Sequence, residues 1–308
     1  MTNKAKLTLG PVLFNWTPEK WRDFYFSIAD EAELDCVTIG EVVCSKRLPF
    51  FEPVIGEVVE RLQAGGKEVV MSTLALIMTK REMGIVRDLA AMDDMLVEAN
   101  DVSTAALLAG KPHTIGPFIN IYNEGTLGFF AKSGATRVCL PVEVPSATMK
   151  VLAASVDSDD GPELEVLSFG RLPLAVSARC YHARAHNLTK DNCQYVCGED
   201  NDGMELDTLD GEAFLAVNGT QTLSYTCNNL IGELAEMQQM GINRFRLSPQ
   251  DIDMIAVTKI FRDTLDGKTA PDEAMATLDV LAQGLEFSNG YFHDQEGGRM
   301  MAPDDVAE

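Results

Sequence analysis

The chain has 308 residues, of which 46% are hydrophobic and 23% are charged, so it can build a core large enough to fold without disulfides. Its formal net charge of -22 argues against nucleic acid and anionic membranes as partners, because both require basic patches. Residues 1–16 hold no apolar run of signal-peptide length, and no later stretch suggests a spanning helix. We therefore expect a cytoplasmic protein without direct membrane insertion.

Strand-like and helix-like segments alternate along the chain from its start. The strand-like segments are short and apolar: 6–14, 35–41, 68–75, 94–100, 112–120, 137–143, 163–170 and 244–249. The helical segments between them are amphipathic: 18–32, 51–66, 79–91, 102–109, 124–132, 145–154 and 251–265. Thr17 and Pro18 are typical of the N-cap and first turn of a helix. This alternation predicts a parallel sheet of the α/β class.

About eight strands suit a (β/α)8 barrel of the TIM type, and we predict this fold for one domain spanning residues 1–308. An open doubly wound parallel sheet is the alternative, although no glycine fingerprint follows the first strand. Residues 171–230 break the alternation with clustered cysteines, an acidic loop and an extended or hairpin-like segment at 214–224. We predict that this range is an insertion on the barrel.

Three of the seven cysteines, Cys180, Cys193 and Cys197, fall in one short stretch. In a reducing compartment, clustered cysteines favour metal binding or catalysis over disulfides. Cys44 follows the second predicted strand, and in a closed barrel its loop shares one face with the loop after the seventh. Four thiols could therefore converge there.

The other three cysteines are predicted to be structural. Cys36 and Cys139 lie within apolar strand patterns, where a free cysteine behaves as a small hydrophobe, and Cys227 ends a mixed segment.

Four cysteines can hold a tetrahedral zinc ion or a [4Fe-4S] cluster. The spacing C-x12-C-x3-C lacks the paired short spacings of structural zinc and is irregular, as in cluster sites. The spacing by itself leaves cluster, zinc and no site open. His182 and His186 lie nearby, but such histidines more often orient a site than bind the metal. A cysteine nucleophile paired with His113, His182 or His186 has no local support.

Reactive groups of barrel enzymes lie where strands run into the following loops. The polar candidates at these places are Glu41, Glu98, Asn100, Asp101, Asn120, Tyr122, Asn123, Glu143 and Ser168. Each can equally be a helix cap or a solvated loop residue. Lys46 and Arg47, beside Cys44, are candidates for anion contacts or for electrostatic support of a thiolate site. HExxH, GxSxG and complete P-loop motifs are missing, so the catalytic residues stay unassigned.

Eight segments carry a resemblance to a known family: LGPVLFNW, IGEVVCSKR, STLALI, VLSFGRLPLAVSARCYHAR, DNCQYVC, LAVNGTQTLS, RLSPQ and SNGYF. In this order they resemble segments of the collagenase-like (U32-type) peptidase family, in its branch for oxygen-independent ubiquinone biosynthesis. The resemblance implies a [4Fe-4S] cluster on the four cysteines of its motif, which fall on Cys44, Cys180, Cys193 and Cys197.

The same resemblance implies a heterodimer with a related UbiU-like protein that carries its own cluster. A UbiT-like lipid-binding protein belongs to the same pathway. Together they would hydroxylate ubiquinone precursors without oxygen, with prephenate as the oxygen donor. Two readings from other classes stand beside it: a peptidase, as the family name suggests, and a zinc-stabilised binding protein.

Overall fold

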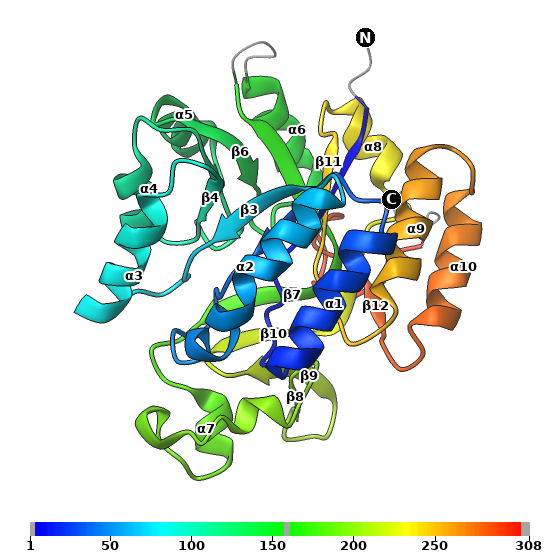
Figure 1. Ribbon diagram of the computed structural model, residues 1–308. Coiled ribbons are helices and arrows are strands. Elements are labelled where there is room, and N and C mark those ends of the chain that lie inside the picture. Colours follow the sequence, from blue (N-terminus) through cyan, green and yellow to red (C-terminus); the bar gives the residue numbers. More distant parts are fainter. Residues whose placement is uncertain (1–3, 157–160, 303–308) are drawn as a thin grey trace.

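The computed structural model describes residues 4–156 and 161–302, where the chain forms a barrel of parallel strands surrounded by helices (Figure 1). The barrel strands are β1 (Lys6–Leu9), β2 (Cys36–Ile39), β3 (Glu68–Ser72), β4 (Leu96–Ala99), β5 (His113–Ile115), β6 (Ala135–Cys139), β7 (Glu163–Val176) and β11 (Arg244–Leu247). Each pairs in parallel with the next, and β11 closes the ring by pairing with both β7 and β1. The predicted (β/α)8 barrel is confirmed, and the open sheet is wrong because such a sheet leaves two edges unpaired.

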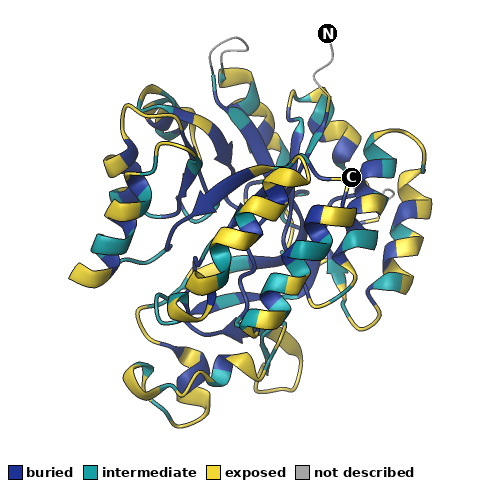
Figure 2. Cartoon of the chain, viewed as in Figure 1, coloured by how far each residue is buried: buried dark blue, intermediate teal, exposed yellow. Residues whose placement is uncertain are grey.

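Helices follow the strands and cover the outside of the barrel. They are α1 (Pro18–Glu31), α2 (Leu48–Ala64), α3 (Lys80–Ala90), α4 (Val102–Leu108), α5 (Glu124–Lys132), α6 (Ser146–Ser155), α8 (Leu234–Gln239), α9 (Met254–Leu265) and α10 (Pro271–Leu281), which packs on α9. The strands are buried while the outward helix faces are exposed (Figure 2). Thr17 caps α1 as predicted, its hydroxyl accepting from the Lys20 amide at 3.2 Å.

Charged side chains cross the inside of the barrel. Arg246 of β11 lies 2.6 Å from the Glu165 carboxylate of β7 and also contacts Glu98 of β4, and all three side chains are at most 3% exposed. Because β4 lies across the barrel from β11, the Glu98 contact joins strands that do not pair. An arginine paired on both sides meets the requirement that buried charges be compensated.

Strand β7 is longer than the predicted 163–170, because its outer half leaves the barrel and finds a new partner. From Phe169 to Val176 it pairs antiparallel with β10 (Gln221–Asn229). Antiparallel partners extend this sheet further: β9 (Ala213–Asn218) forms a hairpin with β10, and β8 (Met204–Asp207) pairs with β9. The hairpin expected at 214–224 is therefore present. On its other side β10 takes the short strand β12 (Phe287–Ser288) in parallel.

Between β7 and β8 the chain forms a lobe, residues 177–203, which we call the α7 lobe. It contains α7 (Tyr181–Ala185) and the 3-10 turns η1 (Lys190–Asn192) and η2 (Val196–Gly198). Figure 1 shows α7 beside β8 and β9, at the end of the molecule opposite the N-terminus. Because α8 and β11 resume the barrel repeat afterwards, the predicted insertion range 171–230 occupies the position of the loop that follows the seventh strand.

Two predicted strands are shorter than expected. The segments 6–14 and 112–120 end as strands at Leu9 and Ile115, and the chain then crosses the end of the barrel. The residue after Ile115 is Gly116, where a Cβ atom would lie 1.9 Å from Asn100 Oδ1. The close approach of two loops therefore ends the ladder there.

Among the described residues, none of the helices combines the length and the apolar character needed to cross a bilayer.

Candidate functional site

Cys44, Cys180, Cys193 and Cys197 line one small cavity. Cys44 lies in the loop between β2 and α2, Cys180 caps α7, Cys193 follows η1, and Cys197 lies within η2. All four are free thiols; Cys180 and Cys197 are buried and the other two are partly buried. The loops after the second and seventh barrel strands thus meet at the C-terminal end of the barrel, and they bring together thiols that are distant in the sequence.

The four sulfurs line the cavity without forming a tight group of three. Within the described ranges, the group of three or more His, Cys, Asp or Glu side chains whose ligand atoms all lie within 4.8 Å is His182, His186 and Asp200. No three of the cysteine sulfurs are therefore that close together. Four thiolates around one zinc ion, at Zn–S bonds of about 2.3 Å, would lie roughly 3.8 Å apart. No three of the cysteine sulfurs therefore stand at the mutual spacing that one zinc ion requires.

Amide groups point at two of the sulfurs. The Ala183 amide donates to Cys180 Sγ and the Asn15 side-chain amide donates to Cys197 Sγ, both at 3.4 Å. Burial raises the pKa of the Cys44 and Cys180 thiols. A bound metal opposes this effect, because coordination deprotonates a thiol. The N–H groups would then face thiolates, whose negative charge they stabilise.

Arg47 supplies a buried positive charge in the wall of the same cavity. Its Nη2 donates to Asn218 Oδ1 at 2.5 Å, its Nη1 lies 3.9 Å from Glu41 Oε1, and its Nε is buried without a hydrogen-bond partner. Burial works against the charge, but Glu41 and the thiols Cys197 and Cys44 outweigh it and raise the pKa of Arg47. The guanidinium is therefore a permanent cation beside the sulfurs.

The hairpin between β9 and β10 forms the floor beneath this arginine. Gly219 in its turn has a φ of 67°, and a Cβ atom there would lie 2.6 Å from Arg47 Nη2. Next to it, Asn218 donates to the backbone oxygens of Cys197 and Asp200, both at 3.3 Å. Glycine is thus required both by the backbone conformation and by the approach of Arg47.

The turn between Cys193 and Cys197 has an uncommon backbone conformation. Gln194 and Tyr195 have φ values of 50° and 58°, in the left-handed region that non-glycine residues seldom adopt. Tyr195 packs edge-on against Phe50 of α2, with ring centroids 4.8 Å apart. Backbone strain of this kind persists where the surroundings enforce it, and it is concentrated at functional sites.

Of the predicted neighbours of Cys44, Glu41 and Lys46 have structural contacts. Glu41 Oε1 accepts from the amides of Val43 at 2.7 Å and Cys44 at 2.9 Å, and burial raises the pKa of its carboxyl. This carboxylate holds the Cys44 loop. Lys46 Nζ reaches the Lys190 carbonyl, and so it ties the same loop to the α7 lobe.

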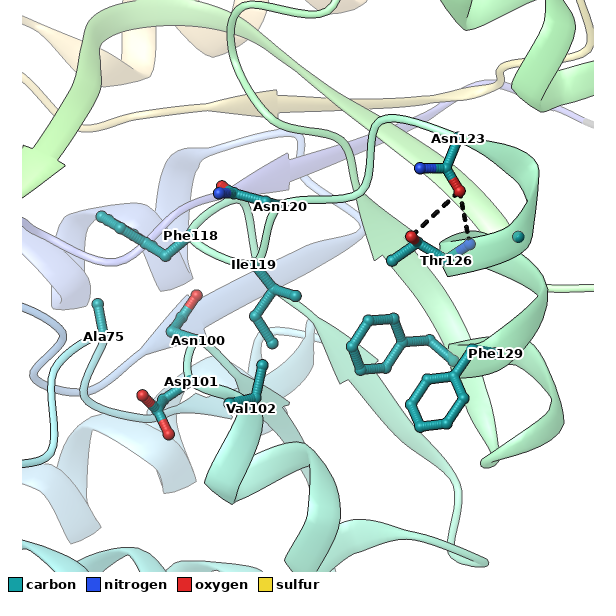
Figure 3. A pocket seen from close by; sticks show the side chains of 12 residues that line it. Ala75, Asn100, Asp101, Val102, Phe118, Ile119, Asn120, Asn123, Thr126 and Phe129 are labelled. Atoms are coloured by element: carbon teal, nitrogen blue, oxygen red, sulfur yellow. Dashed lines mark hydrogen bonds between the residues drawn. The ribbon is translucent and has the colours of Figure 1, made fainter.

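A larger cavity of about 590 Å³ lies at the same end of the barrel, between the loops after β3, β4 and β5. Figure 3 shows Asn100, Phe118 and Asn120 around it. Asn100 donates to Ser72 Oγ at 2.8 Å, while its own Oδ1 is buried without a partner. This oxygen is packed against Gly116, so a ligand in the cavity would meet other atoms of its lining.

Several other candidates serve local structure. Asp101 and Asn123 line the larger cavity, but they are also the N-caps of α4 and α5. Helix capping was the alternative role predicted for them. Ser168 is buried and donates to the Val166 carbonyl at 3.1 Å. Tyr122 donates to Glu143, which joins the loops after β5 and β6 outside both cavities.

The three remaining cysteines do not line the thiol cavity. Cys36, Cys139 and Cys227 are fully buried, and burial raises the pKa of Cys36 and of Cys227 to about 12. His113 begins β5, at the opposite end of the barrel from the four thiols, so it cannot serve them as a base.

Three side chains near the site were not predicted from the sequence. Arg246, Gln250 and Asp200 were not singled out, although Arg246 and Gln250 are buried near the end of β11. The signal for Arg246 was its position within an apolar strand, where a charge requires a buried partner.

The fold and the site together define a class of protein, in which a parallel (β/α)8 barrel carries four thiols at its C-terminal end. The chain belongs to peptidase family U32, whose model matches residues 20–302. This membership confirms the resemblance at the level of the family.

Two solved structures are similar to the chain. One is D-psicose 3-epimerase with D-tagatose from Clostridium cellulolyticum H10, at 12% identity and a TM-score of 0.40, over 91% of this chain and 99% of that chain. The other is a truncated 3-deoxy-D-arabino-heptulosonate 7-phosphate synthase from Thermotoga maritima, at 9% identity and a TM-score of 0.34, over 94% of this chain and 91% of that chain.

Proposed function

We propose that the chain is a UbiV-type subunit that carries a [4Fe-4S] cluster on Cys44, Cys180, Cys193 and Cys197. With a UbiU-like partner that holds its own cluster, it supports oxygen-independent hydroxylation in ubiquinone biosynthesis, with prephenate as the oxygen donor. The observation that carries the proposal is the convergence of four free thiols on one cavity beside a buried arginine. The role in ubiquinone biosynthesis rests on the resemblance of the sequence.

The chemistry of the cavity suits an anionic cluster. Thiolates and sulfides accumulate negative charge, which a buried site must offset. Arg47 provides a fixed cation and an Nε–H group that has no other partner. N–H groups aimed at Cys180 and Cys197 act in the same direction, and such hydrogen bonds are one means by which a protein sets a cluster's potential. When bound, the cluster supplies one-electron chemistry.

The absence of a tight group of three sulfurs among the described cysteines favours the cluster over zinc. Several iron atoms and sulfides stand between the thiolates of a cluster, whereas the ligands of one ion must meet at a single centre. His182 and His186 do not line the thiol cavity and cannot complete a mixed zinc site there.

In this proposal the larger cavity receives the ring of the substrate. Phe118, Ile119 and Phe129 give it apolar walls, and Asn100 and Asn120 add amide groups. Apolar walls with a few polar groups suit an aromatic ring that bears polar substituents.

The decisive experiment is anaerobic purification followed by absorption spectroscopy and assays of iron, sulfide and zinc. We expect a brown protein with a broad band at about 400 nm and iron and sulfide in equal amounts. A colourless protein with one zinc per chain would contradict the proposal. The pathway role is tested by quantifying ubiquinone in a deletion strain grown without oxygen, rescued with the wild-type chain, Cys193→Ala or the matched control Cys227→Ala. Rescue by Cys193→Ala would separate the pathway from the cluster.

A further inference from the structure

A second group of ligand-type side chains lies in the α7 lobe, outside the thiol cavity. His182 on α7, His186 at its C-cap and Asp200 after η2 each offer a ligand atom, and these atoms all lie within 4.8 Å of one another. The two imidazole rings are parallel, with an interplanar angle of 4° and centroids 5.5 Å apart. His182 is fully buried, Asp200 is partly buried and His186 is exposed.

The hydrogen bonds of His182 determine which nitrogen faces Asp200. Its Nδ1 lies 3.1 Å from the Val217 carbonyl oxygen, which can only accept, so Nδ1 carries a proton. In the neutral ring the lone pair is then on Nε2. This atom lies 3.0 Å from Asp200 Oδ2, yet it is buried and makes no hydrogen bond. A lone pair and a carboxylate oxygen at this distance repel each other unless a cation lies between them.

The arrangement matches that of metal-binding histidines. A ligating imidazole almost always donates its other N–H to a carbonyl or carboxylate, which fixes the tautomer, and the Val217 carbonyl has this position. With metal–ligand bonds of about 2.0 to 2.2 Å, two ligand atoms lie roughly 2.9 Å apart at a right angle and about 3.4 Å apart in a tetrahedron. The separation of 3.0 Å between Nε2 and Oδ2 lies in this range.

An ion pair between a protonated His182 and Asp200 explains less. At a separation of 3.0 Å such a pair would normally form an aligned N–H···O bond, which Nε2 does not make. It also gives no reason for a second imidazole, His186, to lie parallel and close to a ring that is already charged.

We propose that His182, His186 and Asp200 bind a divalent transition-metal ion, with Zn²⁺ as the ion that this ligand set suits best. Two imidazole nitrogens and one carboxylate oxygen are ligands typical of zinc. Because His186 is exposed and Asp200 is partly so, water can complete the coordination shell.

Such an ion would fasten the two halves of the α7 lobe together. His182 lies two residues after Cys180, and Asp200 lies three residues after Cys197. The ion therefore bridges the segments that carry these two thiols, and Asn218 already links the Cys197 and Asp200 backbones from the other side. The ion is therefore a structural metal that positions the turns carrying the thiols. Its binding does not depend on what the thiols hold.

The test is equilibrium dialysis of the full chain against Zn²⁺ without oxygen, with zinc and iron measured together in each sample. Since even the partners that orient metal ligands are worth about 10- to 100-fold in affinity, loss of a direct ligand should weaken binding by at least about tenfold. His186→Ala and Asp200→Asn are the test variants, because neither side chain is fully buried. Glu199→Gln is the matched control, an exposed carboxylate beside Asp200.

We expect one zinc per chain in the wild type and in Glu199→Gln, and weaker zinc binding with unchanged iron in both test variants. Equal zinc binding by all four proteins would overturn the proposal, as would the absence of zinc from the wild type. Zinc that rises as iron falls would also overturn it, because the ion would then occupy the thiols.

Discussion

At the scale of single residues, substitution of the four cavity cysteines and of the three structural cysteines should have opposite effects on the iron content. Cys44→Ala, Cys180→Ala, Cys193→Ala and Cys197→Ala should each lose most of the bound iron, because each removes one corner of the thiol cavity. Cys36→Ala, Cys139→Ala and Cys227→Ala should keep it, because these thiols do not line the cavity. Iron and sulfide assays on anaerobically purified variants check this. Full iron retention in Cys193→Ala would show that the cavity is not the site.

Arg47 has a double role, as the cation beside the sulfurs and as the partner of Glu41. Arg47→Met should lower the free energy of unfolding by roughly 3–5 kcal/mol, because it leaves the Glu41 carboxylate buried without its opposing charge. Chemical denaturation of the iron-free protein measures this loss of stability separately from any effect on the iron content. Lys46→Met is the control, since the Lys46 side chain is partly exposed and contacts only the Lys190 carbonyl and the exposed Asp191, so that its loss should change stability little. Equal effects of the two variants would refute the role of burial.

At the scale of elements, the β9–β10 hairpin is predicted to act through one glycine. Gly219→Ala requires a left-handed alanine, which costs about 1–2 kcal/mol, and places a Cβ atom against Arg47. Gly211→Ala imposes the same backbone penalty at a φ of 85°, with no atom within 4 Å of its Cβ. Gly219→Ala should lose at least as much stability as Gly211→Ala, and we expect only Gly219→Ala to lose iron. Denaturant melts and iron assays on both variants test this prediction. Equal iron contents would show that the hairpin does not support the thiol cavity.

The alternation of elements could be predicted because most barrel strands are short and rich in apolar residues, whereas the helices between them are amphipathic. The outer half of β7 could not be predicted. Its residues 171–176 pair only with β10, some fifty positions later, and nothing in the local sequence indicates that partner. The convergence of Cys44 with the later thiols was predictable from barrel closure. The positions of His186 and Asp200 were not, because the left-handed turns of the α7 lobe depend on tertiary contacts such as that between Tyr195 and Phe50.

At the scale of the whole molecule, the barrel has a core that does not include the thiol cavity. Exposure to air should therefore bleach the protein without unfolding it, with loosening confined to the α7 lobe. Far-ultraviolet circular dichroism and absorption, recorded before and after oxygen treatment, make the comparison. A cooperative loss of helix signal in step with the colour would show instead that the cluster is needed for folding.

Under the proposed function, an apolar quinone precursor has to reach a chain with a net charge of -22. We expect delivery to depend on other proteins, and a stable one-to-one complex with a UbiU-like partner whose interface lies partly outside the cysteine loops. Co-expression followed by size exclusion with light scattering tests this. Separate elution of the two chains, both with intact clusters, would contradict the heterodimer. Co-elution of Cys193→Ala with the partner would support an interface independent of the thiols.

The order in which the barrel is built also constrains how the protein matures. Cys44 leaves the ribosome long before Cys180, and the ring closes only when β11, at residues 244–247, pairs with β1 and β7. The turn at Gly219, which contacts Arg47, is synthesised later than all four thiols of the cavity. A partly synthesised chain therefore exposes its early thiol with no cavity around it. Under the proposed function, the cluster is therefore delivered after translation is nearly complete, and until then the nascent chain depends on a reducing environment to keep Cys44 unmodified.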